Sequence, residues 1–340
     1  MTIDVTSQFY LYMSDNLSLL ETTPRAKQVS ILGIPLDLGK DNIGTDAGVG
    51  AIRSQGLLEM FEFLKITVRD RGDIACPDRA TAEIGKKNLK FLESIVTVAE
   101  QSARIVDEEI RNNRVVFALG GDHSVSLGTI AGASAAVNGK LGVIWIDAHG
   151  DMMTHENTLS GNIHGMPSAA AFGLGHERLT TIYKKERKVA PENMLYIGLK
   201  DLDQGEIDLI RNQQLTAFTI FDILQNGWSP IFTAIQELST RVDRIWVSLD
   251  LDSIDRMFAP GTPMQNNGGL TYREITHLAR FIGKNCALAG ADIVEYAPML
   301  DVDNKTAKLA LELIAALCGT EYGWYQQYMH EEMKKQTLRA

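Results

Sequence analysis

One stretch, residues 141–164, reads LGVIWIDAHGDMMTHENTLSGNIH. It opens with six apolar, mostly branched residues, a run short enough to form a buried β-strand. Asp147, His149 and Asp151 follow at every second position, so their side chains point the same way if the chain stays extended. Two carboxylates and an imidazole at one spot repel or take up protons unless a cation joins them. We therefore expect a divalent metal at the carboxyl end of this strand, of the Mn, Fe, Co, Ni or Zn type.

Two further polar clusters also follow apolar runs. The GGDHS segment comes directly after VVFAL and contains His123. The SLDLDSID segment ends another strand and places Asp250 and Asp252 two residues apart, whereas Asp255 is expected to cap the next turn. Carboxylates at the end of a buried strand need partners. Three such clusters outweigh the alternative for the first stretch, which is a solvated acidic turn.

Six side chains make up the candidate metal site: His123, Asp147, His149, Asp151, Asp250 and Asp252. This set exceeds what one tetrahedral zinc ion needs and suits two divalent ions about 3.5–4 Å apart that share carboxylates. Such a pair lowers the pKa of a bound water molecule towards neutrality, which makes hydroxide available at pH 7. The sequence therefore favours hydrolysis.

Strand and helix patterns alternate along the 340 residues, which favours one α/β domain with a mostly parallel sheet. We expect strands at 29–34, 66–68, 114–119, 141–146, 194–198, 215–219, 244–251 and 286–293. We expect helices at 51–61, 82–112, 126–137, 231–238, 271–282 and 305–317, and one more that follows the loop to His164 and ends at Phe172. The helix at 271–282 opens with a Thr271–Glu274 capping box. A TIM barrel is the rival fold, but the spacing is irregular for eight equal units.

The segment PLDLGKDNIGTDAGVG follows the first strand and is rich in glycine. It has neither a GxGxxG nor a GxxxxGK[ST] pattern, so a phosphate cradle is not indicated. We expect it to form a loop across the carboxyl end of the sheet. Ligands bind at that edge of an open parallel sheet, and each of the three polar clusters follows a predicted strand there.

Composition narrows the partners. The net charge of −10, from 33 basic and 43 acidic residues, argues against non-specific nucleic-acid binding and against an anionic membrane surface. Three cysteines without a close pair give no disulfide framework and fit a reducing compartment. No apolar run approaches the roughly 18 residues of a membrane span, and the first residues lack a secretory pattern. We expect a soluble, cytoplasmic protein.

GGDHS, DAHGD and SLDLDSID resemble, in this order, the signature motifs of the ureohydrolase family, which includes arginases and agmatinases. The resemblance runs from about Ser30 to Gly319. It implies a single three-layer α/β/α domain and two Mn²⁺ ions, with Co, Fe or Ni as other candidate metals. It also implies two ligand sets in which Asp147 and Asp250 bridge the ions: His123, Asp147, Asp151 and Asp250 for one, and Asp147, His149, Asp250 and Asp252 for the other.

Within this family the sequence is most similar to the arginase members. SGNIHGMP looks like their loop for the amino-acid end of the substrate, GLKDLDQGE resembles a second binding segment, and GTP supplies one more site position. The matching substrate-binding positions are Thr158, Ser160, Asn162, Asp203, Glu206 and Thr262. The resemblance implies that Asp203 receives the α-ammonium group with help from Glu206. It further implies that His164 shuttles protons and that Glu295 pairs with the guanidinium group.

The implied reaction is hydrolysis of L-arginine to L-ornithine and urea, in which Asp151 orients the attacking hydroxide. Two departures bear on the substrate. Met153 stands where arginases usually carry an asparagine that faces the α-carboxylate, and MQNNGG at 264–269 is longer than the usual loop. Agmatine, guanidinobutyrate, formiminoglutamate or another guanidino compound is the alternative. A further alternative is a metal-binding relative that has lost catalysis, against which the six ligands with His164 and Glu295 argue.

We divide the chain into an N-terminal arm (1–27), a ureohydrolase domain (28–319) and a C-terminal tail (320–340). The arm is polar and mixed, with an amphipathic stretch at 9–20. The tail carries several aromatic residues, including Tyr322 and Trp324. These side chains either cover the domain's own core or contact another subunit, because the tail of the resembling family often contributes to a trimer. We expect a homo-oligomer, either a trimer or a hexamer.

Overall fold

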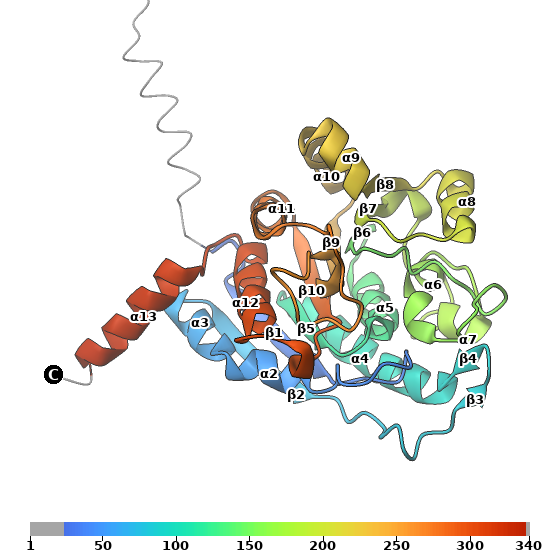
Figure 1. Ribbon diagram of the computed structural model, residues 1–340, viewed down its shortest axis with the longest axis horizontal. Coiled ribbons are helices and arrows are strands. Elements are labelled where there is room, and N and C mark those ends of the chain that lie inside the picture. The colour runs from blue at the N-terminus through green and yellow to red at the C-terminus, as the bar shows by residue number, and fades with distance from the viewer. Residues whose placement is uncertain (1–23, 338–340) are drawn as a thin grey trace, which may run out of the picture.

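An eight-stranded sheet forms the centre of the molecule (Figure 1), in the order β2-β1-β5-β10-β9-β6-β7-β8. The computed structural model describes residues 24–337, so most of the expected arm 1–27, including the stretch 9–20, lies outside the described residues. The strands are β1 (Gln28–Ile34), β2 (Thr67–Asp73), β5 (Val115–Gly120), β6 (Leu141–Ile146), β7 (Met194–Leu199), β8 (Thr216–Thr219), β9 (Arg244–Asp250) and β10 (Leu288–Val294). All neighbouring strands in this sheet are parallel. Because β2 and β8 are the two edges, the sheet is open and the TIM-barrel alternative is wrong.

Helices cover both faces of the sheet, because successive strand residues point to opposite sides. In β5, Phe117 belongs to one buried cluster and Val116 to the other. The Phe117 face packs against α2 (Gly48–Ser54), α3 (Leu57–Phe63), α9 (Ile220–Asn226), α10 (Ser229–Arg241), α11 (Tyr272–Asn285) and α12 (Lys305–Leu317). The Val116 face packs against α4 (Leu92–Arg111), α5 (Ser126–Ala136), α6 (Pro167–Ala171), α7 (Glu177–Thr180) and α8 (Gln204–Gln213). The expected three-layer α/β/α fold is confirmed.

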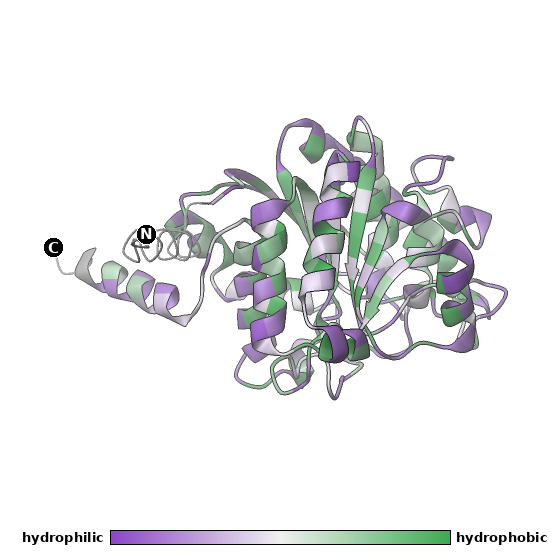
Figure 2. Cartoon of the chain, turned by 90° about the horizontal axis from the view of Figure 1, so that it is seen from above, coloured by the Kyte–Doolittle hydropathy of each residue, from purple (hydrophilic) through white to green (hydrophobic). Residues whose placement is uncertain are grey.

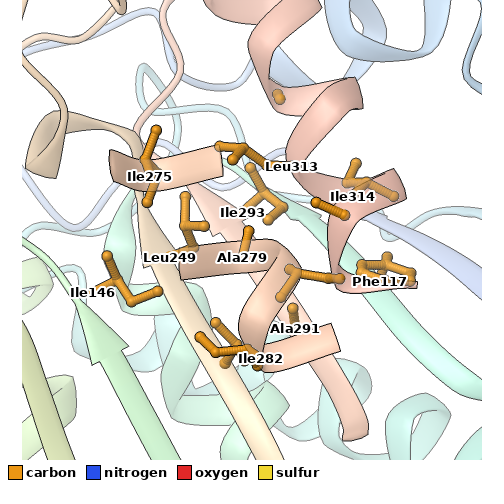
Figure 3. Close-up of a cluster of buried hydrophobic side chains, with 14 of the residues drawn as sticks. Phe117, Ile146, Leu249, Ile275, Ala279, Ile282, Ala291, Ile293, Leu313 and Ile314 are labelled. Atoms are coloured by element: carbon orange, nitrogen blue, oxygen red, sulfur yellow. The ribbon is translucent and has the colours of Figure 1, made fainter. Parts of the chain in front are cut away.

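The core on the first face shows how the layers are joined (Figure 3). One face of α11 carries apolar residues at helical spacing, namely Ile275, Ala279 and Ile282. These side chains face the sheet and pack against Leu249 of β9 and Ile293 of β10. α11 begins at the expected capping box, in which Thr271 and Glu274 satisfy each other's backbone N–H groups. The capping box therefore predicted the start of this helix.

Two expected helices were wrong in extent. The helix expected at 82–112 begins only at Leu92, because the chain first forms a short antiparallel hairpin in which Gly85 has a φ of 71°. The helix expected at 51–61 is divided into α2 and α3 at Gly56, which has a φ of 89°. The hairpin and the short 3₁₀ turns are β3 (Gly85–Lys86), β4 (Leu89–Lys90), η1 (His123–Val125), η2 (Ile163–Gly165), η3 (Pro191–Asn193), η4 (Leu251–Ser253) and η5 (Pro298–Leu300).

Helices α8 and α9 were not predicted. Each begins at a capping box, formed by Asp203 with Glu206 for α8 and by Thr219 with Asp222 for α9. These pairs satisfy backbone groups at the helix start. Capping boxes were therefore the available sequence signal for both helices.

The C-terminal tail forms α13 (Trp324–Thr337), which projects away from the three layers (Figures 1 and 2). Tyr322 is buried, with its hydroxyl 3.0 Å from His330 Nδ1. Trp324 and Tyr325 are exposed by 75% and 60%. Of the two alternatives for the aromatic tail, coverage of the domain's own core fits Tyr322 but not Trp324 and Tyr325.

All three cysteines are free, with Cys286 and Cys318 buried and Cys76 half-buried. None of the helices within residues 24–337 is long and apolar enough to cross a membrane.

Candidate metal centre

The three polar clusters meet at the carboxyl edge of the sheet. β5, β10, β9 and β6 are neighbours in this order, and parallel strands bring their carboxyl ends to one edge. His123 follows β5, Glu295 follows β10, Asp250 ends β9 and Asp147 follows β6. Side chains that are far apart in the sequence therefore share one buried place.

His123 stands at the centre of the first group. Its Nδ1 atom lies 3.1 Å from Asp147 Oδ2, 3.0 Å from Asp151 Oδ2 and 3.1 Å from Asp250 Oδ2. The ring of His123 is fully buried and stacks on Trp145, with ring centroids 4.2 Å apart. One imidazole nitrogen thus faces three carboxylate oxygens at similar distances.

His149 defines the second group. Its Nδ1 atom lies 3.3 Å from Asp147 Oδ1 and 3.5 Å from Asp252 Oδ2. The two carboxylate oxygens of Asp147 therefore face different groups, one towards His123 and one towards His149. Five of the six sequence-predicted ligands form two groups with the spacing of a metal site: His123, Asp147 and Asp151 in one, and Asp147, His149 and Asp252 in the other. The two groups are joined through Asp147, and Asp250 lies beside the first through its contact with His123.

The donor set fits divalent ions. Ligand atoms that share one ion at about 2.1 Å lie about 3 Å apart when they are at right angles around it, which matches the spacing around His123. Among residues 24–337, His123 Nδ1 and Asp252 Oδ1 are buried atoms without a hydrogen bond of good geometry. Buried polar atoms normally have a hydrogen-bond partner. The lack of one at these two atoms therefore indicates that the groups bind a cation.

The electrostatics of the bare cluster point the same way. Burial, with Asp252 and Asp147 adding to it, raises the pKa of Asp250 well above its ordinary value. Burial also raises the pKa of Asp252 to about 6. Burial alone would lower the pKa of His123, but the surrounding carboxylates outweigh it and raise that pKa. These raised pKa values show that the carboxylates gather an excess of negative charge, which bound metal ions would compensate.

A buried hydrogen-bond chain orients His123 from behind. Its Nε2 atom lies 2.9 Å from Ser248 Oγ, and that hydroxyl donates to Asp292 Oδ1 at 2.6 Å. Because Ser248 uses its hydrogen on Asp292, it accepts from His123, which assigns the ring proton to Nε2 and leaves Nδ1 for the metal groups. Asp292 also accepts from Thr129 Oγ1 and Trp246 Nε1, each at 2.7 Å.

The chain was expected to stay extended after the strands, but it turns instead. Asp147 Oδ1 accepts from the N–H of His149 at 2.8 Å, and Asp151 has a φ of 50°. Asp250 Oδ1 accepts from the N–H of Asp252 at 2.7 Å, at the start of the 3₁₀ turn η4. Tight turns, rather than the alternation of a strand, therefore aim these side chains at one place.

A cavity of about 250 Å³ opens beside the two groups. Its lining includes His149, Asp151, His164, Asp203 and Glu206. Asp203 is exposed, while burial raises the pKa of Glu206 to about 7. Oε1 of Glu206 accepts from a backbone N–H in the loop after Asp151, so α8 is tied to the metal-site loop.

Two methionines also line this cavity. Met153 is half-buried, and Met264 begins the MQNNGG segment. Met153 and the first residue of the long MQNNGG segment therefore both face the space beside the metal groups. A thioether at either position offers apolar surface where an amide would offer a hydrogen-bond donor.

In the described part of the chain, four predicted substrate residues do not line this cavity: Thr158, Ser160, Asn162 and Thr262. Thr158 Oγ1 accepts from the N–H of Gly161 at 3.0 Å, and Ser160 Oγ accepts from the N–H of Asn162 at 3.2 Å. The amide oxygen of Asn162 accepts from a lysine side chain at 3.1 Å. Thr262 is fully buried, and its hydroxyl has no partner among the described residues.

Glu295 directly follows β10 and is 2% exposed. It adopts a left-handed φ of 65°, and its N–H donates to Gly121 O at 2.8 Å. Its Oε1 atom accepts from the N–H of His123 at 2.9 Å and lies 3.5 Å from His164 Nδ1. A buried lysine, Lys40, donates to the other oxygen. The structure therefore places Glu295 and His164 side by side at the metal groups.

The family model described as "Arginase family" matches residues 27–319 of this chain. The chain belongs to the arginase family. An arginase from Brevibacillus brevis is 41% identical over 296 residues, which cover 86% of this chain and 98% of that relative. The solved structure of arginase from Bacillus caldovelox has a TM-score of 0.83 and 38% identity, and it covers 87% of this chain and 100% of its own. Arginase of Entamoeba histolytica, solved in complex with L-ornithine, has a TM-score of 0.80 and 32% identity, covering 87% and 99%.

Sequence reasoning missed three residues of this arginase-family site. Ser248 stood inside the third motif and was given no role, although a hydroxyl in a buried strand needs a partner. Asp292 was a lone charge in an apolar run, which is the usual sign of a buried network. Lys40 lay in the glycine-rich segment, which was interpreted only as a loop.

We predict that Ser248→Ala weakens divalent-metal binding about 10- to 100-fold, because the imidazole of His123 loses the partner that fixes its tautomer and orientation. Equilibrium dialysis with Mn²⁺ measures the effect. Ser134→Ala is the matched control, because that buried hydroxyl bonds to Lys188 O at 2.5 Å, outside the metal groups. Equal metal affinity in both variants would show that the hydrogen-bond chain does not position His123.

Proposed function

We propose that this chain hydrolyses L-arginine to L-ornithine and urea, as a hydrolase of linear amidine C–N bonds. The observation that carries the proposal is the pair of His/Asp groups joined through Asp147 beside a cavity whose wall includes Asp203. Family membership supports the same chemistry, since relatives named arginase share 35–41% of their residues with this chain over 86–87% of its length.

The proposed cofactor is a pair of Mn²⁺ ions, with Co, Fe or Ni as the other metals that this oxygen and imidazole set accepts. His123, Asp147, Asp151 and Asp250 would hold one ion. The other would be held by Asp147, His149, Asp250 and Asp252. When bound, such a pair supplies a nucleophilic hydroxide at neutral pH and stabilises developing negative charge.

The residues of the chain then orient the substrate and move protons. Glu295 faces the position of the guanidinium group, whose central carbon is attacked. Asp151, held by its left-handed turn, accepts a hydrogen bond from the nucleophile and passes the proton towards the departing amine. His164 is half-buried, lies 3.5 Å from Glu295 and lines the cavity, so it offers a second route for that proton. Water is consumed, and the C–N bond to the ornithine nitrogen breaks.

The amino-acid end of the substrate is assigned to the other side of the cavity. Asp203 is exposed there and would receive the α-ammonium group, while the capping box with Glu206 holds it at the start of α8. Thr158, Ser160 and Asn162 form the neighbouring loop proposed for the α-carboxylate. Thr262 completes the set as a buried hydroxyl. Loading with metal and substrate would have to bring this loop to the cavity.

We also propose a homo-oligomer, either a trimer or a hexamer. Its support is α13, whose Trp324 and Tyr325 are exposed on a projecting helix. Large exposed aromatic side chains on one element are typical of an interaction surface. A cytoplasmic location remains an expectation, supported by three free cysteines.

Urea release by Mn-loaded protein tests the substrate, with L-arginine and agmatine compared at saturating concentration. We expect urea from L-arginine and little from agmatine, because agmatine keeps an ammonium group for Asp203 but lacks the α-carboxylate that is assigned to the loop of Thr158, Ser160 and Asn162. Urea from agmatine but not from arginine would move the substrate to another guanidino compound, with Met153 as the reason. Urea from neither would contradict both assignments.

Asp147→Ala and Asp250→Ala should each lose bound manganese and urea release together, because both carboxylates are assigned to both ions. Metal content by atomic emission and urea release at saturating arginine measure the two losses. Asp255→Ala is the control, since its carboxylate bonds to the N–H groups of Met257 and Gly268 at 2.8 and 2.7 Å instead. Full activity of Asp147→Ala or Asp250→Ala with the metal lost would refute the bridging roles.

A further inference from the structure

We propose that Lys40 determines how strongly this site binds guanidinium groups. Its ammonium group neutralises Glu295, the carboxylate assigned to the guanidinium, and thereby weakens the ground-state binding of every guanidinium cation. The inference rests on the proposed function, because it concerns the same pocket. It assigns Lys40 as a specificity-determining residue and distinguishes this site from one with a free glutamate.

The contact between the two side chains is direct and buried. Lys40 Nζ donates to Glu295 Oε2, and each side chain is only 3% exposed. The other oxygen of Glu295 accepts from the N–H of His123 at 2.9 Å and lies 3.5 Å from His164 Nδ1. Both oxygens of the carboxylate are therefore engaged before a substrate arrives.

The backbone fixes Lys40 in this position. The N–H of Gly39 donates to Asp122 Oδ2 at 2.7 Å, and Gly39 O accepts from the N–H of His164 at 3.0 Å. Lys40 O accepts from Arg79 Nη2 at 2.6 Å. The ion pair is thus held by a loop anchored on both sides of the site, not by a long side chain that reaches in from solvent.

The charges around Lys40 keep it cationic. Burial alone would lower the pKa of Lys40, but Glu295 and Asp122 outweigh it and raise that pKa above its ordinary value. Asp122, which accepts from the N–H of Gly39 in the same loop, is fully buried. A guanidinium group is also always charged at neutral pH. A substrate therefore meets a carboxylate whose charge is already balanced, beside a positive group in a low-dielectric site where like charges repel strongly.

Lys40→Gln tests the inference through the KM and kcat of urea release. We expect the KM for L-arginine and for agmatine to fall at least tenfold, about 1.4 kcal/mol, while kcat changes less than threefold. Lys40→Arg keeps the charge and should show no fall in KM. Lys188→Gln controls for the loss of a buried lysine, because Lys188 Nζ bonds to carbonyl groups elsewhere, such as Thr180 O at 2.7 Å. An unchanged or higher KM in folded Lys40→Gln would overturn the inference.

Met153→Asn provides a contrast within the same cavity. This change acts at the amino-acid end, so it should alter the preference between arginine and agmatine. Lys40→Gln should improve both substrates equally, since both carry a guanidinium group. A large effect of Lys40→Gln on one substrate alone would contradict a role at Glu295.

A binding measurement on the unmodified protein covers the case in which Lys40→Gln does not fold. Calorimetry compares guanidinium with urea, a neutral molecule of the same planar shape, in the Mn-loaded protein. We expect guanidinium to bind no more tightly than urea, and a preference of tenfold or more for guanidinium would overturn the inference. This outcome does not depend on turnover, so absence of urea release would count against the proposed function only.

Discussion

The rest of the site depends on one constraint, the repulsion among four buried carboxylates, whose charge the surrounding groups must compensate. Asp147, Asp250 and Asp252 are each 2% exposed or less, and the imidazoles of His123 and His149 contact them. Isolated buried charges cost several kcal/mol each unless they are compensated. The proposed divalent ions would supply that compensation most fully, because each would cancel two charges and be shared between carboxylates. The hydrogen bonds from Trp145 Nε1 to Asp147 and from Ser248 to Asp292 hold the proposed ligands in place.

The sheet solves the positional part of the problem. With β10 and β9 lying between β5 and β6, the ends of four adjacent strands bring the proposed ligands and Glu295 to one edge. The chain then turns sharply, and two functional residues, Asp151 and Glu295, adopt left-handed conformations with φ of 50° and 65°. Such conformations cost about 1–3 kcal/mol each and persist only where the surroundings enforce them. Hydrogen bonds of the loops on both sides of the metal groups hold Asp151 and Glu295 in these conformations.

The sequence predicted the fold where its signals are local and repeated. The strands and α11 and α12 follow from apolar runs and helical spacing, and the three motifs identified the six candidate ligands because each motif ends a strand. Features that depend on one glycine were not foreseen, such as the hairpin at Gly85 and the break at Gly56. The pairing of Lys40 with Glu295 joins residues 255 positions apart, and no local pattern carries that information. The same holds for Asp292 behind His123.

The most direct test of the account is the state of manganese in the loaded protein. Ions that share Asp147 and Asp250 must lie close together, so equilibrium dialysis should find two Mn²⁺ per chain and electron paramagnetic resonance should show a magnetically coupled pair. One Mn²⁺ per chain, or two ions with the six-line spectrum of isolated Mn²⁺, would contradict the shared-carboxylate site.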